Sequence, residues 1–204
     1  MIRRTRGRRV ALIAAVLGAG LVLSACSSND TLAQQWNSAS DKGYIAGDGS
    51  TTSIEAEART EAVAFSGVDE TGAEIDSADY AGSVTVVNFW YAGCPPCRAE
   101  APDLQEVSDE MMPEGVKFLG VNTRDQEAQA IQFAKEFSIG FPSIMDAKDN
   151  RATQRAFAGQ VPLNAVPTTL VLDTEGRVAH RVLGQLAGAS QLRTLIKETQ
   201  AEAE

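Results

Sequence analysis

Two cysteines separated by two residues are the strongest chemical signal in this 204-residue sequence. They form Cys94-Pro-Pro-Cys97, and the only other cysteine is Cys26, near the N-terminus. A disulfide that closes so short a loop restricts the unfolded chain far less than a long-range bridge would, so a structural role is the weaker interpretation. The spacing instead predicts a redox pair that exchanges electrons with the thiols or disulfides of other proteins.

The residues around this pair predict that it lies where a buried strand meets a helix. Residues 84–90 form an apolar, β-branched run, which is typical of a strand covered on both faces. Pro95 and Pro96 suit the first turn of a helix, where missing amides cost little. A cysteine just before a helix start lies beside free amide donors and the positive end of the helix dipole, so we expect Cys94 to be the attacking thiolate. Cys97, one turn inside the helix, is then expected to resolve the mixed disulfide.

Glu100 is the candidate for handling protons. Residues 97, 100, 104, 107 and 111 follow alternating spacings of three and four, which puts Glu100 on one helical face with Cys97 and three apolar residues. Burial on this face would raise the pKa of the carboxyl group and let it exchange a proton with a cysteine. A solvated glutamate is the alternative interpretation.

The remaining pattern predicts an α/β domain over residues 60–204, with a central mixed sheet flanked by helices. Strands at 62–68 and 73–75 are joined by a turn at 70–72, which predicts an N-terminal β-hairpin extension. The alternation of strand, helix, strand and helix from residue 84 to Phe137 implies parallel pairing. Antiparallel pairing is expected later in the chain, where two strands flank a short turn. The expected elements are strands at 116–121, 168–172 and 177–183, a helix to about Met112, a helix whose capping box joins Thr123 to Gln126, and a closing helix that Ser190 caps.

The N-terminal segment predicts export. Residues 1–9 carry five arginines and no acid, and residues 10–23 are uncharged, which is the layout of a signal peptide. The run is shorter than the roughly 20 apolar residues that a membrane-spanning helix needs. Leu23-Ser24-Ala25-Cys26 resembles the lipobox of bacterial lipoproteins, so residues 1–25 are expected to be removed and Cys26 to carry lipid. A chance cysteine behind an ordinary secretory signal is the alternative.

Composition separates a tether from the acidic domain. Residues 26–59 are rich in Ser, Thr, Asp, Ala and Gly without a sustained hydrophobic period, which predicts a flexible tether from the lipid. The chain has a formal net charge of −9, and loss of the five N-terminal arginines leaves 13 basic against 27 acidic residues. Nucleic acid is therefore an unfavourable partner. The expected location is outside the cytoplasm, with attachment to the cell membrane through the lipid on Cys26.

Residues 87–102, Val-Asn-Phe-Trp-Tyr-Ala-Gly-Cys-Pro-Pro-Cys-Arg-Ala-Glu-Ala-Pro, resemble the active-site segment of the TlpA/ResA-like thioredoxin-fold oxidoreductases. The resemblance extends to Val166-Pro167-Thr168-Thr169 and the strands that follow, and it covers residues 60–201. It implies a thioredoxin-like fold and a membrane-tethered disulfide reductase that acts on protein disulfides, among them those of apocytochrome c. It further implies a membrane electron donor and no cofactor.

The same resemblance implies roles for single residues. Pro167 is expected to be cis and to face the two cysteines, with the backbone of Val166 free to pair with an extended substrate segment. Trp90 matches the family and is expected at the substrate site, and a family glutamate at the position of Glu100 implies the proton-handling role. The sequence departs from the family at Gly93, where a tryptophan usually precedes the first cysteine, so substrate docking is expected to differ.

The direction of electron flow and the class of protein leave alternatives. Pro95 and Pro96 lack amide hydrogens that would stabilise the Cys94 thiolate, which favours a reductant over a disulfide-forming oxidase. The rival from another class is a metal-binding lipoprotein, because two cysteines and a histidine can hold copper or zinc. His180, the only histidine, is expected to be a surface residue of the final hairpin, so no metal site is predicted.

Overall fold

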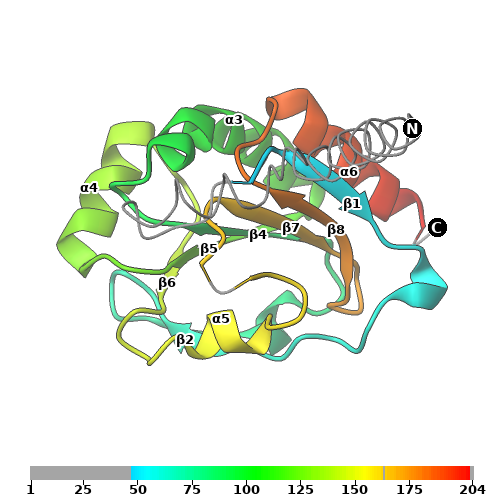
Figure 1. The fold of residues 1–204 in the computed structure, drawn as a ribbon, viewed down its shortest axis with the longest axis horizontal. Helices are drawn as coiled ribbons and strands as arrows, with labels where there is room; N and C mark the ends of the chain where they lie inside the picture. Colours follow the sequence, from blue (N-terminus) through cyan, green and yellow to red (C-terminus); the bar gives the residue numbers. More distant parts are fainter. Residues whose placement is uncertain (1–46, 163, 203–204) are drawn as a thin grey trace, which may run out of the picture. The chain divides into compact units, whose positions relative to one another are not determined.

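The fold is built on a six-stranded mixed sheet (Figure 1). The structure, a computed structural model, describes residues 47–162 and 164–202. The strand order is β1-β8-β7-β4-β5-β6. Strands β4, β5 and β6 run parallel, whereas β7, β8 and β1 continue the sheet by antiparallel pairing. This arrangement confirms the predicted mixed sheet. Its strands are β1 (Ser50–Ser53), β8 (Val178–Leu183), β7 (Thr168–Leu172), β4 (Thr85–Trp90), β5 (Lys117–Asn122) and β6 (Ser143–Met145).

Both faces of the central strands are covered. Every residue of β4 is buried, as the continuous apolar run predicts for a central strand. Val86 packs with residues of the helices α3 and α6, and its neighbour Val87 packs on the opposite side with Phe65 and Phe157. The helices are α3 (Pro95–Met111), α4 (Glu127–Phe137), α5 (Ala152–Ala156) and α6 (Ala189–Ala201), with short 3-10 turns η1 (Ala56–Ala58), η2 (Ser77–Tyr80) and η3 (Met112–Glu114).

The N-terminal hairpin forms as predicted but as a separate two-stranded sheet. Strand β2 (Ser66–Val68) pairs antiparallel with β3 (Glu74–Asp76). Asp69 shapes the intervening turn, because its side chain accepts hydrogen bonds from the amides of Thr71 and Ala73. An isolated bridge between Asp69 and Ile144 joins this hairpin to the edge strand β6.

Helix α4 begins later than the capping pattern predicts. Its N-cap is Gln126, whose side chain exchanges capping bonds with Gln129, and the helix runs from Glu127. The expected cap, Thr123, donates its amide to the carbonyl of Trp90 at 3.0 Å instead. Thr123 therefore belongs to a loop that follows β5. The closing helix differs in a similar way, because its N-cap is Gly188 and not Ser190.

The folded domain starts earlier than residue 60. Residues 47–59, which were expected to belong to the tether, lie against the final hairpin: β1 pairs with β8, and the Arg59 side chain is only 2% exposed. Backbone hydrogen bonds and buried contacts thus make this stretch part of the domain. The predicted signal peptide, Cys26 and the first part of the tether, up to residue 46, lie outside the described residues. No helix within residues 47–162 and 164–202 is long and apolar enough to span a bilayer.

Candidate active site

Cys94 and Cys97 are joined by a disulfide at the start of α3. The Cα atoms are 5.3 Å apart, and Cys94 is the N-cap of the helix. Its sulfur also accepts the amide of Cys97 at 3.3 Å. Pro95 and Pro96 occupy the two positions between them and have no amide to donate. Cys97 therefore supplies the nearest helix amide available to a Cys94 thiolate.

The surface beside this disulfide is open on one side of Cys94. Cys94 and Cys97 are themselves buried, with exposed fractions of 0% and 2%. Gly93 and Pro95, the two neighbours of Cys94, are exposed. A Cβ atom built on Gly93 would meet a ring carbon of Tyr91 at 3.5 Å, which is ordinary contact. The backbone would thus accept a side chain at position 93, and the glycine leaves the rim beside Cys94 uncovered.

The loop that delivers Cys94 is held by the loop after β5. The amide of Ala92 donates to the Asp125 carboxylate at 2.6 Å, and Asn122 donates to the same oxygen at 2.8 Å. The Cys94 amide donates to the carbonyl of Tyr91 at 3.1 Å. The sequence reasoning missed Asn122 and Asp125. The signal for them is that Asn122 ends, and Asp125 closely follows, a buried strand that is parallel to β4, so the two strands end at the same edge.

Glu100 lies one helical turn after Cys97 on α3, in the buried interior. Its exposed fraction is 0%, and its carboxyl oxygens accept hydrogen bonds from Asn88 at 2.9 Å and from the Leu186 amide at 2.9 Å. Burial raises the pKa of Glu100 from its ordinary 4.5 to about 7, although these two hydrogen bonds act in the opposite direction. The predicted buried face of α3 is present, with Cys97, Leu104, Val107 and Met111 also buried. A carboxyl group of this kind changes protonation near neutral pH.

Asn88 links Glu100 to the strand that follows Pro167. Its side-chain amide donates to Glu100 and, at 3.0 Å, to the hydroxyl of Thr169. A cavity of about 20 Å³ lies between Asn88, Trp90, Ser143 and Cys97. Its volume suits one water molecule. Polar atoms therefore connect the region behind Cys97 with the carboxyl group of Glu100.

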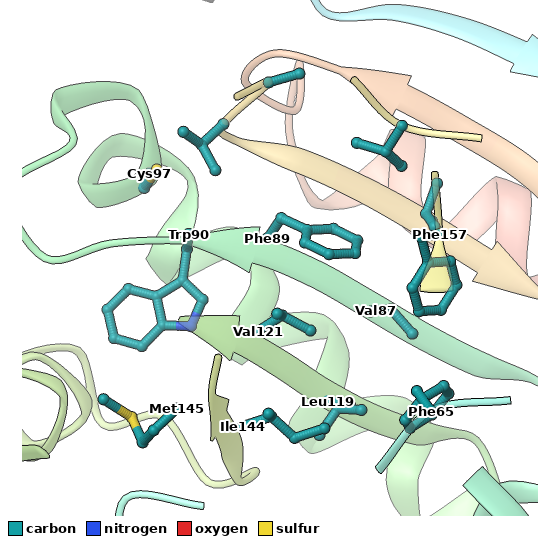
Figure 2. Packing of buried hydrophobic residues seen from close by; sticks show 14 of the residues in the cluster. Phe65, Val87, Phe89, Trp90, Cys97, Leu119, Val121, Ile144, Met145 and Phe157 are labelled. Atoms are coloured by element: carbon teal, nitrogen blue, oxygen red, sulfur yellow. The ribbon is translucent and has the colours of Figure 1, made fainter. Parts of the chain in front are cut away.

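Trp90 supports the site from within the core (Figure 2). Its ring is 5% exposed and lies 4.2 Å from the ring of Phe133, and its indole nitrogen donates to Ser143 at 3.1 Å. Trp90 therefore has a packing role in the core, and its contact with substrate stays a prediction. Arg98 extends the same cluster, because its guanidinium group lies 4.9 Å from the centre of the Phe137 ring.

The Val166–Pro167 peptide bond is cis, as the resemblance implies. Sheet register places it at the end of the sheet where β4 leads to Cys94, which we call the redox end, since Thr168 pairs with Phe89 near the end of β4. Val166 packs in the same buried cluster as Cys94 and Cys97. Among the described residues, no hydrogen bond occupies the backbone amide or carbonyl of Val166. The pairing of the Val166 backbone with an extended substrate segment stays a prediction.

His180 is buried, which corrects the expectation of a surface residue. It is 4% exposed, and its Nδ1 atom lies 2.9 Å from the hydroxyl of Ser53 in the neighbouring strand β1. The sequence reasoning missed this contact because it assigned Ser53 to the tether. Within the described part of the chain, no group of three His, Cys, Asp or Glu side chains is arranged to hold a metal ion.

Comparisons with known proteins identify relatives that share the cysteine-bearing region. The chain is 32% identical over 118 residues to the thiol-disulfide oxidoreductase ResA of Geobacillus thermodenitrificans, covering 58% of this chain and 64% of the relative. It is 37% identical over 103 residues to the thiol:disulfide interchange protein DsbE homolog of Paracoccus denitrificans, covering 50% of this chain and 52% of the relative. The chain thus spans less than two thirds of the length of these curated relatives.

A solved structure and a family model agree with these sequence similarities. A secreted thiol-disulfide isomerase from Corynebacterium glutamicum superimposes with a TM-score of 0.66 at 28% identity, covering 74% of this chain and 92% of that structure. The AhpC/TSA family model matches residues 58–181. The chain therefore belongs to the thioredoxin-like AhpC/TSA family and is a homologue of the ResA and DsbE thiol-disulfide oxidoreductases.

Proposed function

We propose that this protein is a thiol-disulfide oxidoreductase that reduces disulfides of other proteins. The observation that carries the proposal is the Cys94–Cys97 disulfide at a helix start, with the buried carboxyl group of Glu100 behind it. Burial shifts the pKa of Glu100 into the neutral range, as a proton acceptor for Cys97 requires. The names of the relatives support the same reaction class.

The reaction is a two-step thiol exchange. The Cys94 thiolate attacks one sulfur of a substrate disulfide, and the other substrate sulfur leaves as a thiolate that takes up a proton. Cys97 then loses its proton to Glu100 and attacks the Cys94 sulfur, which releases the second substrate thiolate. Two electrons pass to the substrate, and the Cys94–Cys97 disulfide seen in the structure is the oxidised product. A reduced dithiol of a membrane electron donor must return these electrons before the next turnover.

The helix start favours a reductant. A Cys94 thiolate would accept a hydrogen bond from the Cys97 amide. Pro95 and Pro96 have no amide hydrogen and donate none. Strong oxidants of this fold depend on a stabilised thiolate, so a weakly stabilised one favours electron donation. A disulfide-forming or isomerising role is the second candidate. The likeness to the secreted thiol-disulfide isomerase of Corynebacterium glutamicum favours that alternative.

The proposed setting is the outer side of the cell membrane. The export signal and the lipobox-like residues support an anchor on Cys26, which intact-mass analysis of the membrane form would test. Apocytochrome c is the proposed substrate, through the resemblance of residues 87–102 and 166–169 to the TlpA/ResA-like proteins. A metal-binding function has less support. His180 lies in β8 of the final hairpin, and its Nδ1 atom contacts the hydroxyl of Ser53.

A trapping experiment tests the reaction. In the Cys97→Ala variant the second step is missing, so attack by Cys94 should accumulate a mixed disulfide that dithiothreitol releases. Mass spectrometry of the released partner would identify the substrate. The matched control is Cys94→Ala, which retains Cys97 but should trap no partner. Absence of any mixed disulfide in the Cys97→Ala variant, with either apocytochrome or a model disulfide peptide, would contradict the proposal.

A further inference from the structure

Gly93 leaves room in the rim beside Cys94. A Cβ atom built at position 93 would have, apart from its chain neighbours, only two atoms of the described residues within 4 Å, the Tyr91 ring carbons Cε2 at 3.5 Å and Cδ2 at 3.8 Å. Gly93 is exposed, and its φ lies outside the left-handed region that favours glycine. Neither a close contact nor the backbone therefore requires glycine here. We call the space over Gly93, bordered by the Tyr91 ring, the glycine notch.

The Tyr91 ring presents one edge to the glycine notch. A group over the face of a ring lies at a similar distance from all six carbons, whereas a Cβ atom at position 93 approaches only two adjacent ones. A face of the ring is covered by Arg124, whose guanidinium carbon lies 4.5 Å from the ring centre. The edge of an aromatic ring carries partial positive charge, because the electron density is concentrated on its faces. The notch thus has an apolar wall with a weakly positive edge.

The two loops at the redox end hold this wall in place. Tyr91 directly follows β4, and its carbonyl accepts the amide of Cys94 at 3.1 Å. Its half-buried side chain packs against the core cluster that contains Cys94. The backbone of Arg124 is fixed as well, because its amide donates to the side-chain oxygen of Asn122 at 3.1 Å. The ring is therefore positioned beside Cys94 before any substrate arrives, which lowers the cost of binding.

A residue next to a substrate cysteine can reach the glycine notch. In a mixed disulfide with Cys94, the Cα atoms of the two cysteines would be about 4.4–6.8 Å apart. The chain neighbour of each cysteine lies about 3.8 Å further along its own chain. Gly93 is such a neighbour of Cys94, so a substrate segment that runs alongside residues 93 and 94 brings the side chain next to its cysteine over Gly93.

We propose that the glycine notch is a specificity pocket for an aromatic side chain directly adjacent to the disulfide cysteine of the substrate, with Tyr91 as the specificity-determining residue. The inference rests on the thiol exchange proposed above. The face of an incoming ring, directed at the edge of Tyr91, forms the favoured edge-to-face arrangement. A carboxylate would be attracted to Arg124, but the net charge of −9 on the chain opposes an acidic segment.

Selectivity among disulfide peptides tests the pocket. The reduced protein is mixed with peptides that are identical except for Phe, Ala or Asp on both sides of the disulfide cysteine, and stopped-flow kinetics give the rate constant for attack by Cys94. We expect the Phe peptide to react about fivefold faster than the Ala peptide. Equal rates, or the fastest reaction with the Asp peptide, would overturn the proposed pocket but still support the proposed function. Failure to reduce any of the peptides would contradict the proposed function itself.

Two substitutions assign the preference to the glycine notch. Tyr91→Leu removes the aromatic edge and keeps an apolar side chain, and Gly93→Leu fills the notch without changing the ring. In each variant we expect the ratio of the Phe rate to the Ala rate to fall to about one. The ratio is independent of the reactivity of Cys94, because the same sulfur attacks both peptides. A wild-type ratio in either variant would overturn the proposal, and Gly93→Leu keeps it testable if Tyr91→Leu does not fold.

Tyr80→Leu is the matched control. The ring of Tyr80 also lies near a cation, with the Lys117 nitrogen 5.6 Å from its centre. Tyr80 belongs to η2, which precedes β4, so it lies away from the redox end. We expect this variant to keep the fivefold preference for the Phe peptide. Loss of the preference in Tyr80→Leu as well would show that the ratio does not report on the notch, which would overturn the assignment to Tyr91.

Discussion

Two buried carboxyl groups at opposite ends of the sheet have different kinds of partners. Asp173, which follows β7 at the opposite end of the sheet, faces the guanidinium groups of Arg59 and Arg177. Glu100, at the redox end, is fully buried but binds only the amides of Asn88 and Leu186. Buried charges that have ionic partners are generally structural, whereas a buried carboxyl group without one shifts its pKa. The comparison predicts a structural role for Asp173 and a role in proton transfer for Glu100.

Removal of Arg59, an ionic partner of the buried Asp173, should have the largest effect on stability. Arg59→Met leaves Asp173 buried with Arg177 as its remaining cation, so we expect unfolding free energy to fall by about 3 kcal/mol. Chemical denaturation would measure it. The control is Arg193→Met, which breaks the exposed pairs with Glu106 and Glu110 and should cost less than about 1 kcal/mol. Similar losses for both variants would remove the distinction between buried and exposed pairs.

Glu100 should make stability depend on pH in the opposite direction from a paired carboxylate. Its pKa rises from 4.5 to about 7 on folding, so its contribution is fully present below pH 4.5 and is lost as the pH rises through 7. The loss should be on the order of 3 kcal/mol. In Glu100→Gln this loss should disappear, and denaturation curves of the oxidised proteins at pH 4.5, 6 and 8 would detect the change. Parallel pH profiles for the variant and the wild type would mean that Glu100 does not titrate in this range.

The same substitution should slow thiol exchange, because an amide cannot accept a proton from Cys97. We expect a decrease of about 100-fold near neutral pH, at the lower end of general acid–base contributions. Stopped-flow pH profiles of the oxidation of the reduced protein would show it. Asp109→Asn is a suitable control, since this exposed carboxylate lies on the same helix and accepts its hydrogen bond from Gln105. Rates and profiles that match the wild type would return Glu100 to a packing role.

The sequence allowed the redox end to be predicted in much more detail than residues 47–59. The apolar run of β4 and the prolines after Cys94 determine structure through their immediate neighbours in the sequence. The predicted strand, helix start and buried position of Glu100 were therefore confirmed. Residues 47–59 belong to a segment that is rich in Ser, Thr, Asp, Ala and Gly, a composition that is typical of linkers. Their order comes from backbone hydrogen bonds to β8 and from glycine contacts, which composition does not reveal.

The errors at single residues share this cause. His180 was assigned to the surface because its partner Ser53 was placed in the tether. Thr123 fits a capping pattern, but the neighbouring parallel strand offers it the carbonyl of Trp90, which lies 33 positions away in the sequence. Trp90, which was expected at the substrate site, also packs against Phe133 in the core. In each case a partner distant in the sequence decides the residue's role.

The reduction potential of the Cys94–Cys97 pair tests the central claim most directly. Equilibration of the protein against defined dithiol buffers, with the disulfide fraction read by mass, would determine it. Because Pro95 and Pro96 have no amide hydrogen to donate to the Cys94 sulfur, we predict a reduction potential nearer the thioredoxin value of about −270 mV. A potential near the value of about −120 mV that strong oxidants of this fold have would contradict the assignment as a reductant and favour disulfide formation.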